Sequence, residues 1–206
     1  MEVLFNTFVV LFIVIDPVGL APMFLGLTHG GTVAYQRKMA LRGTALASGM
    51  LLVFFFVGDR LLTALGIGLP AFRIAGGALL FLLAIDMVFA RQSGLRSTTT
   101  REQEEAEHKE DISVFPLAFP LIAGPGALTT VLLMSSSWKE PMMFAGMLSV
   151  LLLVLGMTLL SLLWAATLLK FLGQTGTNVV SRLFGLILAA LAVQYILDGL
   201  RSAWAS

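Results

Sequence analysis

A single acidic residue interrupts the first apolar stretch of the chain. Asp16 is the one charged residue between positions 3 and 27, and Pro17 and Gly19 follow it. Counted from position 3 at about 1.5 Å per helical residue, it lies roughly 20 Å along this stretch. The hydrocarbon core of a membrane is about 30 Å thick, so in a spanning helix this carboxylate would lie far from either surface. A charged group at that depth is costly and is a candidate for substrate or ion binding.

A structural role explains the same residues. Aspartate is a preferred N-cap and proline is preferred at the first helical position, so Asp16 and Pro17 would begin a helix that runs to Leu27. The two roles are compatible, because a capping carboxylate keeps its second oxygen for another partner. The motif therefore predicts a break in the first segment, with Asp16, Pro17 and Gly19 as candidate binding residues.

A second break is predicted at Gly124, Pro125 and Gly126, again within an apolar stretch. Proline removes a backbone donor, and glycine lowers the cost of leaving helical geometry. Thr129 and Thr130 follow in the first turn of the helix that would begin there. A helix N-terminus presents unpaired amides and partial positive charge, which suit a carboxylate. We expect these five residues to form the other part of a substrate site; two kinked helices with only a structural role are the alternative.

The breaks belong to a pattern that recurs along the chain. Pro17 and Pro125 lie 108 positions apart, and the pairs Arg73–Gly76 and Arg182–Gly185 open later segments at an offset of 109. Each half would contain three helices, an odd number, so the second half would enter a membrane in the opposite sense. The pattern predicts an inverted repeat with broken helices that meet near the middle of the membrane.

The composition places these motifs in a membrane protein. Of the 206 residues, 58% are hydrophobic and 12% are charged, and the mean hydropathy is +0.94. Soluble domains average about 25% charged residues, and so short a chain could not hide this much apolar surface in one core. The excess apolar surface must face lipid.

Six segments are apolar and long enough to span a bilayer. We expect an all-α fold of six transmembrane helices, with residues 1–90 as the first three-helix repeat, 91–112 as a charged cytoplasmic loop and 113–206 as the second repeat. The loop is either disordered or a short polar helix. The predicted segments are 3–27, 41–58, 70–90, 113–135, 142–169 and 178–200.

Several classes of function are disfavoured. The chain has no cysteine and only two histidines, His29 and His108, which are far apart, so we expect no metal site and no cofactor. An enzyme would need a nucleophile–base pair or a metal cluster at membrane depth, and the sequence offers neither. The net charge of +1 provides no basic surface for nucleic acid.

Two stretches resemble the signatures of a known family. The segment from Ile15 to Leu25, IDPVGLAPMFL, and that from Phe119 to Thr130, FPLIAGPGALTT, resemble the paired motifs of the MarC family, which includes YhgN- and YchE-like proteins. The resemblance extends over the whole chain. It implies six helices in the bacterial inner membrane and transport of small neutral amino acids.

The expected function is secondary transport of a small zwitterion such as glycine or alanine, by alternating access around the two breaks. Asp16 suits an ammonium group or a coupling Na⁺ or proton, and the break at Gly124 to Gly126 suits a carboxylate. The alternatives are a channel or exporter for another small solute, and a structural membrane component. The expected partners are the substrate and the lipid bilayer, and a homo-oligomer is left open.

Basic residues predict the orientation, because lysine and arginine accumulate on the cytoplasmic side. With both termini outside, the cytoplasmic side receives nine of the thirteen: Arg37, Lys38, Arg42, Arg91, Arg96, Arg101, Lys109, Lys170 and Arg182. The external side receives Arg60, Arg73, Lys139 and Arg201.

The orientation can be tested with a reporter that is active only in the cytoplasm. We expect activity when it is fused near Thr100 and none when it follows Ser206. Activity at both positions would rule out six spans with an external C-terminus.

Overall fold

The structure is a computed structural model that describes residues 2–89, 111–137 and 140–204. Most of the predicted loop 91–112 therefore lies outside the described residues. The fold is all-helical, with 91% helix. Its elements are α1 (Glu2–Ile15), α2 (Pro17–Leu27), α3 (Val33–Ala64), α4 (Leu69–Phe89), η1 (Ser113–Ile122), α6 (Pro125–Ser137), α7 (Pro141–Leu163) and α8 (Ala165–Trp204).

Five helical stretches are long and apolar enough to cross a membrane, and a bent pair provides a sixth. The pair is η1 with α6, whose axes differ by 58°. Helices satisfy their own backbone hydrogen bonds, which is why they can carry so apolar a sequence through lipid. The described residues are thus consistent with five or six spans.

The segment around the second motif is less regular than expected. Residues 113–122 form a π-helix, whose turns are wider than those of an α-helix. Within it Phe115 and Phe119 have extended backbone angles, and each lies directly before a proline. Proline disfavours α-helical geometry in the residue before it. A regular α-helix begins only at Pro125. The prediction of one broken helix over 113–135 missed the effect of Pro116 and Pro120.

Two other predicted boundaries were wrong. Helix α3 begins at Val33, eight residues before the predicted position 41, because the Thr32 hydroxyl caps the Tyr35 amide at 3.2 Å. The segment predicted over 142–169 ends at Leu163, and a short helical stretch from Ala165 to Leu172 turns away from it. Gly173, with φ 68° and ψ 170°, then starts the long part of α8. We call residues 164–173 the elbow.

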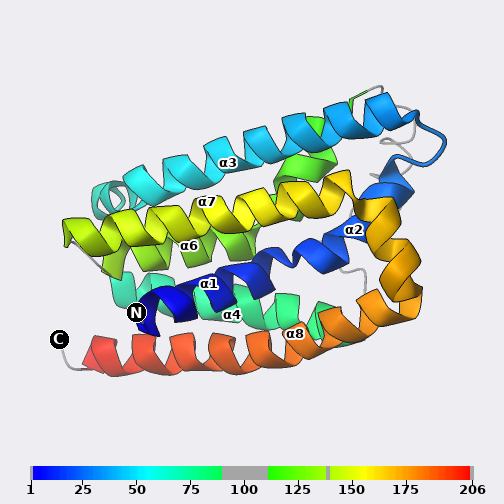
Figure 1. Cartoon of the computed structure of the whole chain (residues 1–206). Coiled ribbons are helices and arrows are strands. Elements are labelled where there is room, and N and C mark those ends of the chain that lie inside the picture. Colours follow the sequence, from blue (N-terminus) through cyan, green and yellow to red (C-terminus); the bar gives the residue numbers. More distant parts are fainter. Residues whose placement is uncertain (1, 90–110, 138–139, 205–206) are drawn as a thin grey trace.

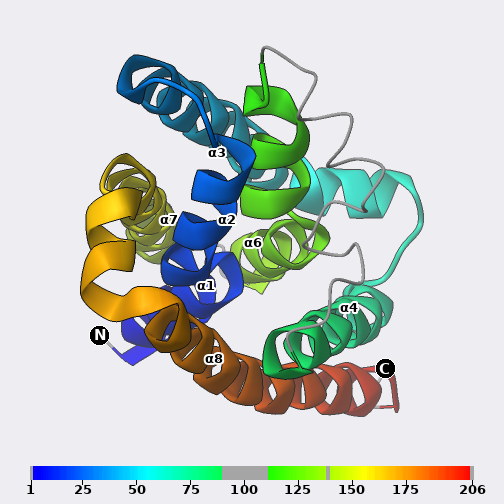
Figure 2. The same cartoon turned by 90° about the vertical axis from the view of Figure 1, so that its right-hand side faces the viewer.

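The two segments that carry the motifs occupy the centre of the bundle. Figure 2 looks along the bundle and shows α1, α2 and α6 in the middle, with α3, α7, α8 and α4 around them. The most apolar window of Glu2–Leu27 is 56% buried, whereas those of the four single outer spans are 22–39% buried. The outer helices therefore present most of the surface available to lipid.

The chain ends and the elbow mark opposite ends of the bundle. In Figure 1 both termini lie at one end, and the elbow and the connection between α2 and α3 lie at the other. At that second end, the Arg42 guanidinium contacts Asp111 at 2.8 Å and ties α3 to the start of η1. Hydrogen bonds from Ser113, together with Arg42, lower the pKa of the Asp111 carboxyl below its usual value.

Among the described helices, α4 and α8 pack against each other most extensively, and glycine lets their backbones approach closely. A Cβ on Gly77 would lie 2.7 Å from the Ala192 carbonyl oxygen, and one on Gly185 would lie 2.8 Å from the Met87 Cβ. Small residues let helix backbones approach closely in membranes. Gly77 and Gly185 are therefore positions where the backbones of α4 and α8 come close together.

Candidate functional site

Helix α1 ends at Ile15 because of the two residues that come after it. Proline at position 17 has no N–H and disfavours α-helical geometry at position 16. Asp16 instead adopts the left-handed region, with φ 49° and ψ 68°, and is the one non-glycine residue with positive φ among those described. Aspartate tolerates this region better than most residues. Helix α2 then begins at Pro17, so the predicted N-cap role of Asp16 is confirmed.

The Asp16 side chain is buried, with 1% of its surface exposed, and both of its oxygens accept hydrogen bonds. Oδ1 accepts the Gly19 amide at 2.9 Å, and Oδ2 accepts the Ser181 hydroxyl at 3.0 Å. A Cβ on Gly19 would overlap Asp16 Oδ2 and would lie 2.6 Å from the Ser181 Oγ. Gly19 is therefore required for the carboxylate to meet both donors.

The Ser181 and Ser161 hydroxyls complete this site, and the sequence reasoning missed both. Ser161 on α7 donates to the Pro17 carbonyl at 2.5 Å, and Ser181 on α8 donates to Asp16. Together they hold the first turn of α2 from two helices of the other half of the chain. In the sequence each of them is only a small polar residue within an apolar segment, and this does not identify the distant group to which it donates.

The second motif forms a smaller and more closed site. Pro125 starts α6, and a cavity of about 10 Å³ lies beside Gly124, Pro125 and Gly126. That is room for about one water molecule. A Cβ on Gly126 would lie 3.0 Å from a Leu83 methyl and 3.1 Å from a Leu80 methyl. Leucine side chains of α4 therefore cover this helix end.

The structure brings the two motifs together through α1. Val14, two residues before Asp16, lines the small cavity at the second motif. A Cβ on Gly126 would lie 3.6 Å from the Val14 side chain. Val14 therefore connects the two motifs, because it packs at the N-terminus of α6 and lies two residues before Asp16.

The two predicted threonines lie inside the helix packing. Thr129 is buried, and its methyl group occupies the space left by Gly76 on α4. Thr130 is fully buried, and its hydroxyl has no hydrogen-bond partner among the described residues. Neither side chain lines the small cavity. Within residues 2–89, 111–137 and 140–204, no three His, Asp or Glu side chains gather where they could hold a metal ion.

The contribution of the Asp16–Ser181 hydrogen bond can be measured with a double-mutant cycle of Asp16→Ala and Ser181→Ala. Interhelical hydrogen bonds in membranes contribute roughly 0.6–1.7 kcal/mol, so we expect a coupling energy of about 1 kcal/mol. The free energy of unfolding is followed in mixed micelles by detergent titration.

Ser149→Ala is the matched control, because its hydroxyl donates only to the Ala145 carbonyl of its own helix. It should change the free energy of unfolding by less than about 0.5 kcal/mol and show no coupling to Asp16→Ala. A coupling near zero for Ser181 would mean that the contact does not hold the first turn of α2.

Comparison with known proteins identifies the family. The profile of MarC family integral membrane proteins matches residues 1–204. A membrane protein of Archaeoglobus fulgidus, described as a UPF0056 membrane protein, is 34% identical over 95% of this chain and 91% of its own length. YvbG of Bacillus subtilis, described in the same way, is 36% identical over 95% and 93%.

The Escherichia coli inner membrane protein YhgN is 34% identical over 98% of both chains. No solved structure matches the chain. Similarity of this extent, on a fold with five or six apolar spans, means that the chain is an integral multi-pass membrane protein and belongs to the MarC family.

Proposed function

We propose that this protein is a secondary transporter of a small neutral amino acid, such as glycine or alanine. The observation that carries the proposal is the buried Asp16 carboxylate at a helix end inside the first span. It lies 14 residues from Glu2 and 11 residues from Leu27, the two ends of that span, or roughly 20 Å and 16 Å at about 1.5 Å per helical residue. A charge this deep in a membrane protein marks a substrate or ion pathway by default.

The chemistry of the two motifs fits a zwitterion. Asp16 offers a negative charge, and the N-terminus of α6 offers amides and partial positive charge. The contact between Val14, two residues before Asp16, and Gly126 supports a single site that includes both motifs. In this proposal, Asp16 receives the substrate ammonium or a coupling Na⁺ or proton, and the turn at Gly124 to Gly126 receives the carboxylate.

The pattern of helix contacts supports an inverted repeat. Helix α8 packs on α2 in the way that α4 packs on α6, and α7 contacts α1 and α2 in the way that α3 contacts η1 and α6. The pairs α4–α8 and α3–α7 join equivalent elements of the two halves, and the contact of α1 with α6 has its counterpart in that of η1 with α2. Most of the larger contacts therefore have a counterpart when the two halves are exchanged. Transporters of this kind bind their substrates between such repeats.

Transport would require the centre of the bundle to open. The cavity at the second motif admits about one water molecule, and Leu80 and Leu83 cover it. In this proposal, α2 and α6 separate from the outer helices to admit a substrate alternately from each side. We propose the orientation with both termini outside in an inner membrane. Both termini lie at one end of the bundle, and the relative YhgN is named an inner membrane protein.

A counterflow experiment in proteoliposomes tests the function. Vesicles loaded with unlabelled alanine should accumulate labelled alanine transiently, because a carrier exchanges substrates and a channel does not. Asp16→Asn should abolish the overshoot or alter its dependence on pH or Na⁺, since it keeps a capping oxygen but removes the charge. Asp59→Asn, at an exposed aspartate of α3, should behave as the unchanged protein does. An overshoot with unchanged ion dependence in Asp16→Asn would reduce Asp16 to a cap.

The zwitterion assignment has its own test. Unlabelled alanine should compete for transport better than alaninamide or propionate does. Alaninamide lacks the carboxylate and propionate lacks the ammonium, so each leaves one part of the site unpaired. A lost hydrogen bond to a charged group is worth roughly 1.5–3 kcal/mol, or on the order of ten- to a hundredfold in affinity. Equal competition by all three compounds would favour a pathway for small solutes in general.

A further inference from the structure

An apolar groove lies beside the first motif and is separate from the small central cavity. Its volume is about 240 Å³, and it opens between α1, α2, α7 and the elbow. Its walls include Phe12, Val18, Met157, Leu160, Trp164 and Leu168. Pro17 and Ser161 also line it, so the groove reaches the hydrogen bond that holds the first turn of α2.

The groove is built for hydrocarbon and not for the substrate. Among the described residues that line it, Ser161 has the one hydroxyl, which already donates to the Pro17 carbonyl, and none has a charged side chain. A zwitterion would lose its hydration there without compensating hydrogen bonds. The groove also belongs to the spanning part of the chain, where lipid acyl chains are the surrounding solvent.

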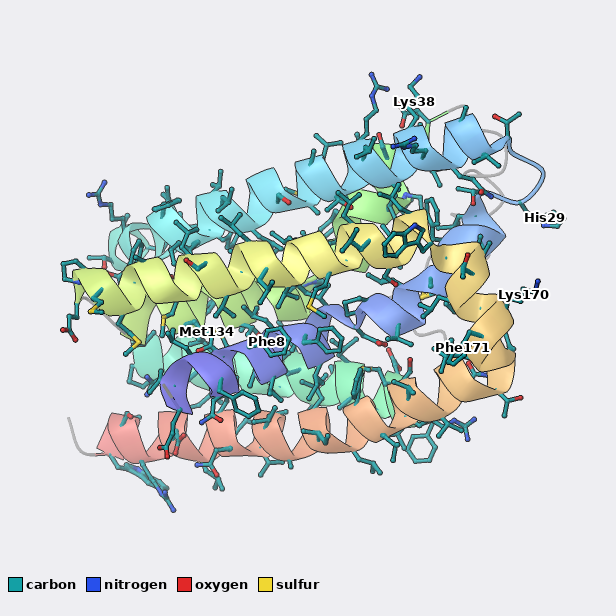
Figure 3. The ribbon with its side chains drawn as sticks, in the orientation of Figure 1. Phe8, His29, Lys38, Met134, Lys170 and Phe171 are labelled. Carbon is teal, nitrogen blue, oxygen red and sulfur yellow. The ribbon has the colours of Figure 1, made fainter. Side chains whose placement is uncertain are left out.

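The elbow lines the groove with Trp164 and Leu168 and carries further aromatic and basic groups. Trp164 is 64% exposed and lines the groove, and Phe171 is 89% exposed. Figure 3 shows Phe171 and Lys170 on the elbow, at the end of the bundle where His29 and Lys38 lie. Aromatic and basic residues in such a segment favour the level of the lipid headgroups.

The elbow carries a positive charge, which favours lipids with an anionic headgroup. From Trp164 to Arg182 the chain contains Lys170 and Arg182 and no acidic residue. We propose that the groove binds one acyl chain of a phospholipid with an anionic headgroup, which lies at Lys170. This lipid would pack against Pro17 and Ser161 and so support the first turn of α2. The proposal goes beyond the transport function and does not depend on it.

Quenching of tryptophan fluorescence by brominated lipid tests this site in the full-length protein. The chain has three tryptophans, Trp138, Trp164 and Trp204. Trp138→Phe with Trp204→Phe leaves Trp164 as the reporter. In phosphatidylcholine vesicles with a small fraction of brominated lipid, brominated phosphatidylglycerol should quench Trp164 with about fivefold higher apparent affinity than brominated phosphatidylcholine. That factor corresponds to about 1 kcal/mol for one basic residue near the membrane surface.

Matched variants separate the groove from ordinary surrounding lipid. Lys170→Gln should remove the preference for the anionic lipid. Leu160→Phe should fill the groove and weaken quenching by both lipids, and Leu152→Phe should not, although the two leucines are 47% and 49% exposed on the same helix. Met157→Phe provides a second way to fill the groove if Leu160→Phe folds poorly. A protein that retains only Trp204 should show no preference.

Either of two results would overturn the proposal. Equal quenching of Trp164 by the two brominated lipids would mean that the elbow does not select an anionic headgroup. Identical quenching in Leu160→Phe, Met157→Phe and Leu152→Phe would mean that no acyl chain occupies the groove, even if Lys170 attracts anionic lipid to the surface.

Discussion

A charged carboxylate inside an apolar bundle must be compensated locally, and this requirement organises the centre of the molecule. The left-handed backbone at Asp16 turns its side chain onto the first turn of α2, where the Gly19 amide donates to it. Gly19 has no side chain to block that approach, and Ser181 supplies the second donor from α8. Alone, the left-handed backbone and the buried carboxylate would be unfavourable, and Gly19 and Ser181 would not stabilise the fold. Together they make a buried charge tolerable.

The same contacts join the two halves of the chain. The first turn of α2 is held by hydroxyls from α7 and α8, which belong to the second half, while Thr129 of α6 packs into a gap left by Gly76 of the first half. A movement of α2 therefore has to change its contacts with both α7 and α8. If the transport proposal is correct, the hydrogen bonds at Asp16 and Pro17 are the interactions that opening of the centre of the bundle would break or exchange. The second motif is instead closed by leucine side chains, which can move without losing a hydrogen bond.

Local chemistry explains which parts of the structure could be predicted from the sequence. The N-cap at Asp16 follows from an aspartate before a proline, and the close approach at Gly77 follows from small residues in an apolar helix. The π-helical geometry of η1 depends on two prolines four residues apart. It was not predicted, because the segment is apolar and long enough to suggest an ordinary spanning helix. The elbow was missed because its first residues, Trp164 to Leu169, are mostly apolar, so the predicted segment 142–169 ran on into them. Ser161 and Ser181 could not be assigned, because their partners are 144 and 165 residues away in the sequence.

The central claim is that the Asp16 site lies on the path of a substrate, and a single cysteine can test it directly. The chain has no native cysteine, so Ser181→Cys gives one reporter thiol beside Asp16. In proteoliposomes, a small water-soluble thiol reagent should label this cysteine, and alanine should slow the labelling more than propionate does. Ser149→Cys, on the exposed face of α7, should show no effect of alanine. A cysteine at position 181 that stays unlabelled, or is labelled at the same rate with and without alanine, would contradict the account.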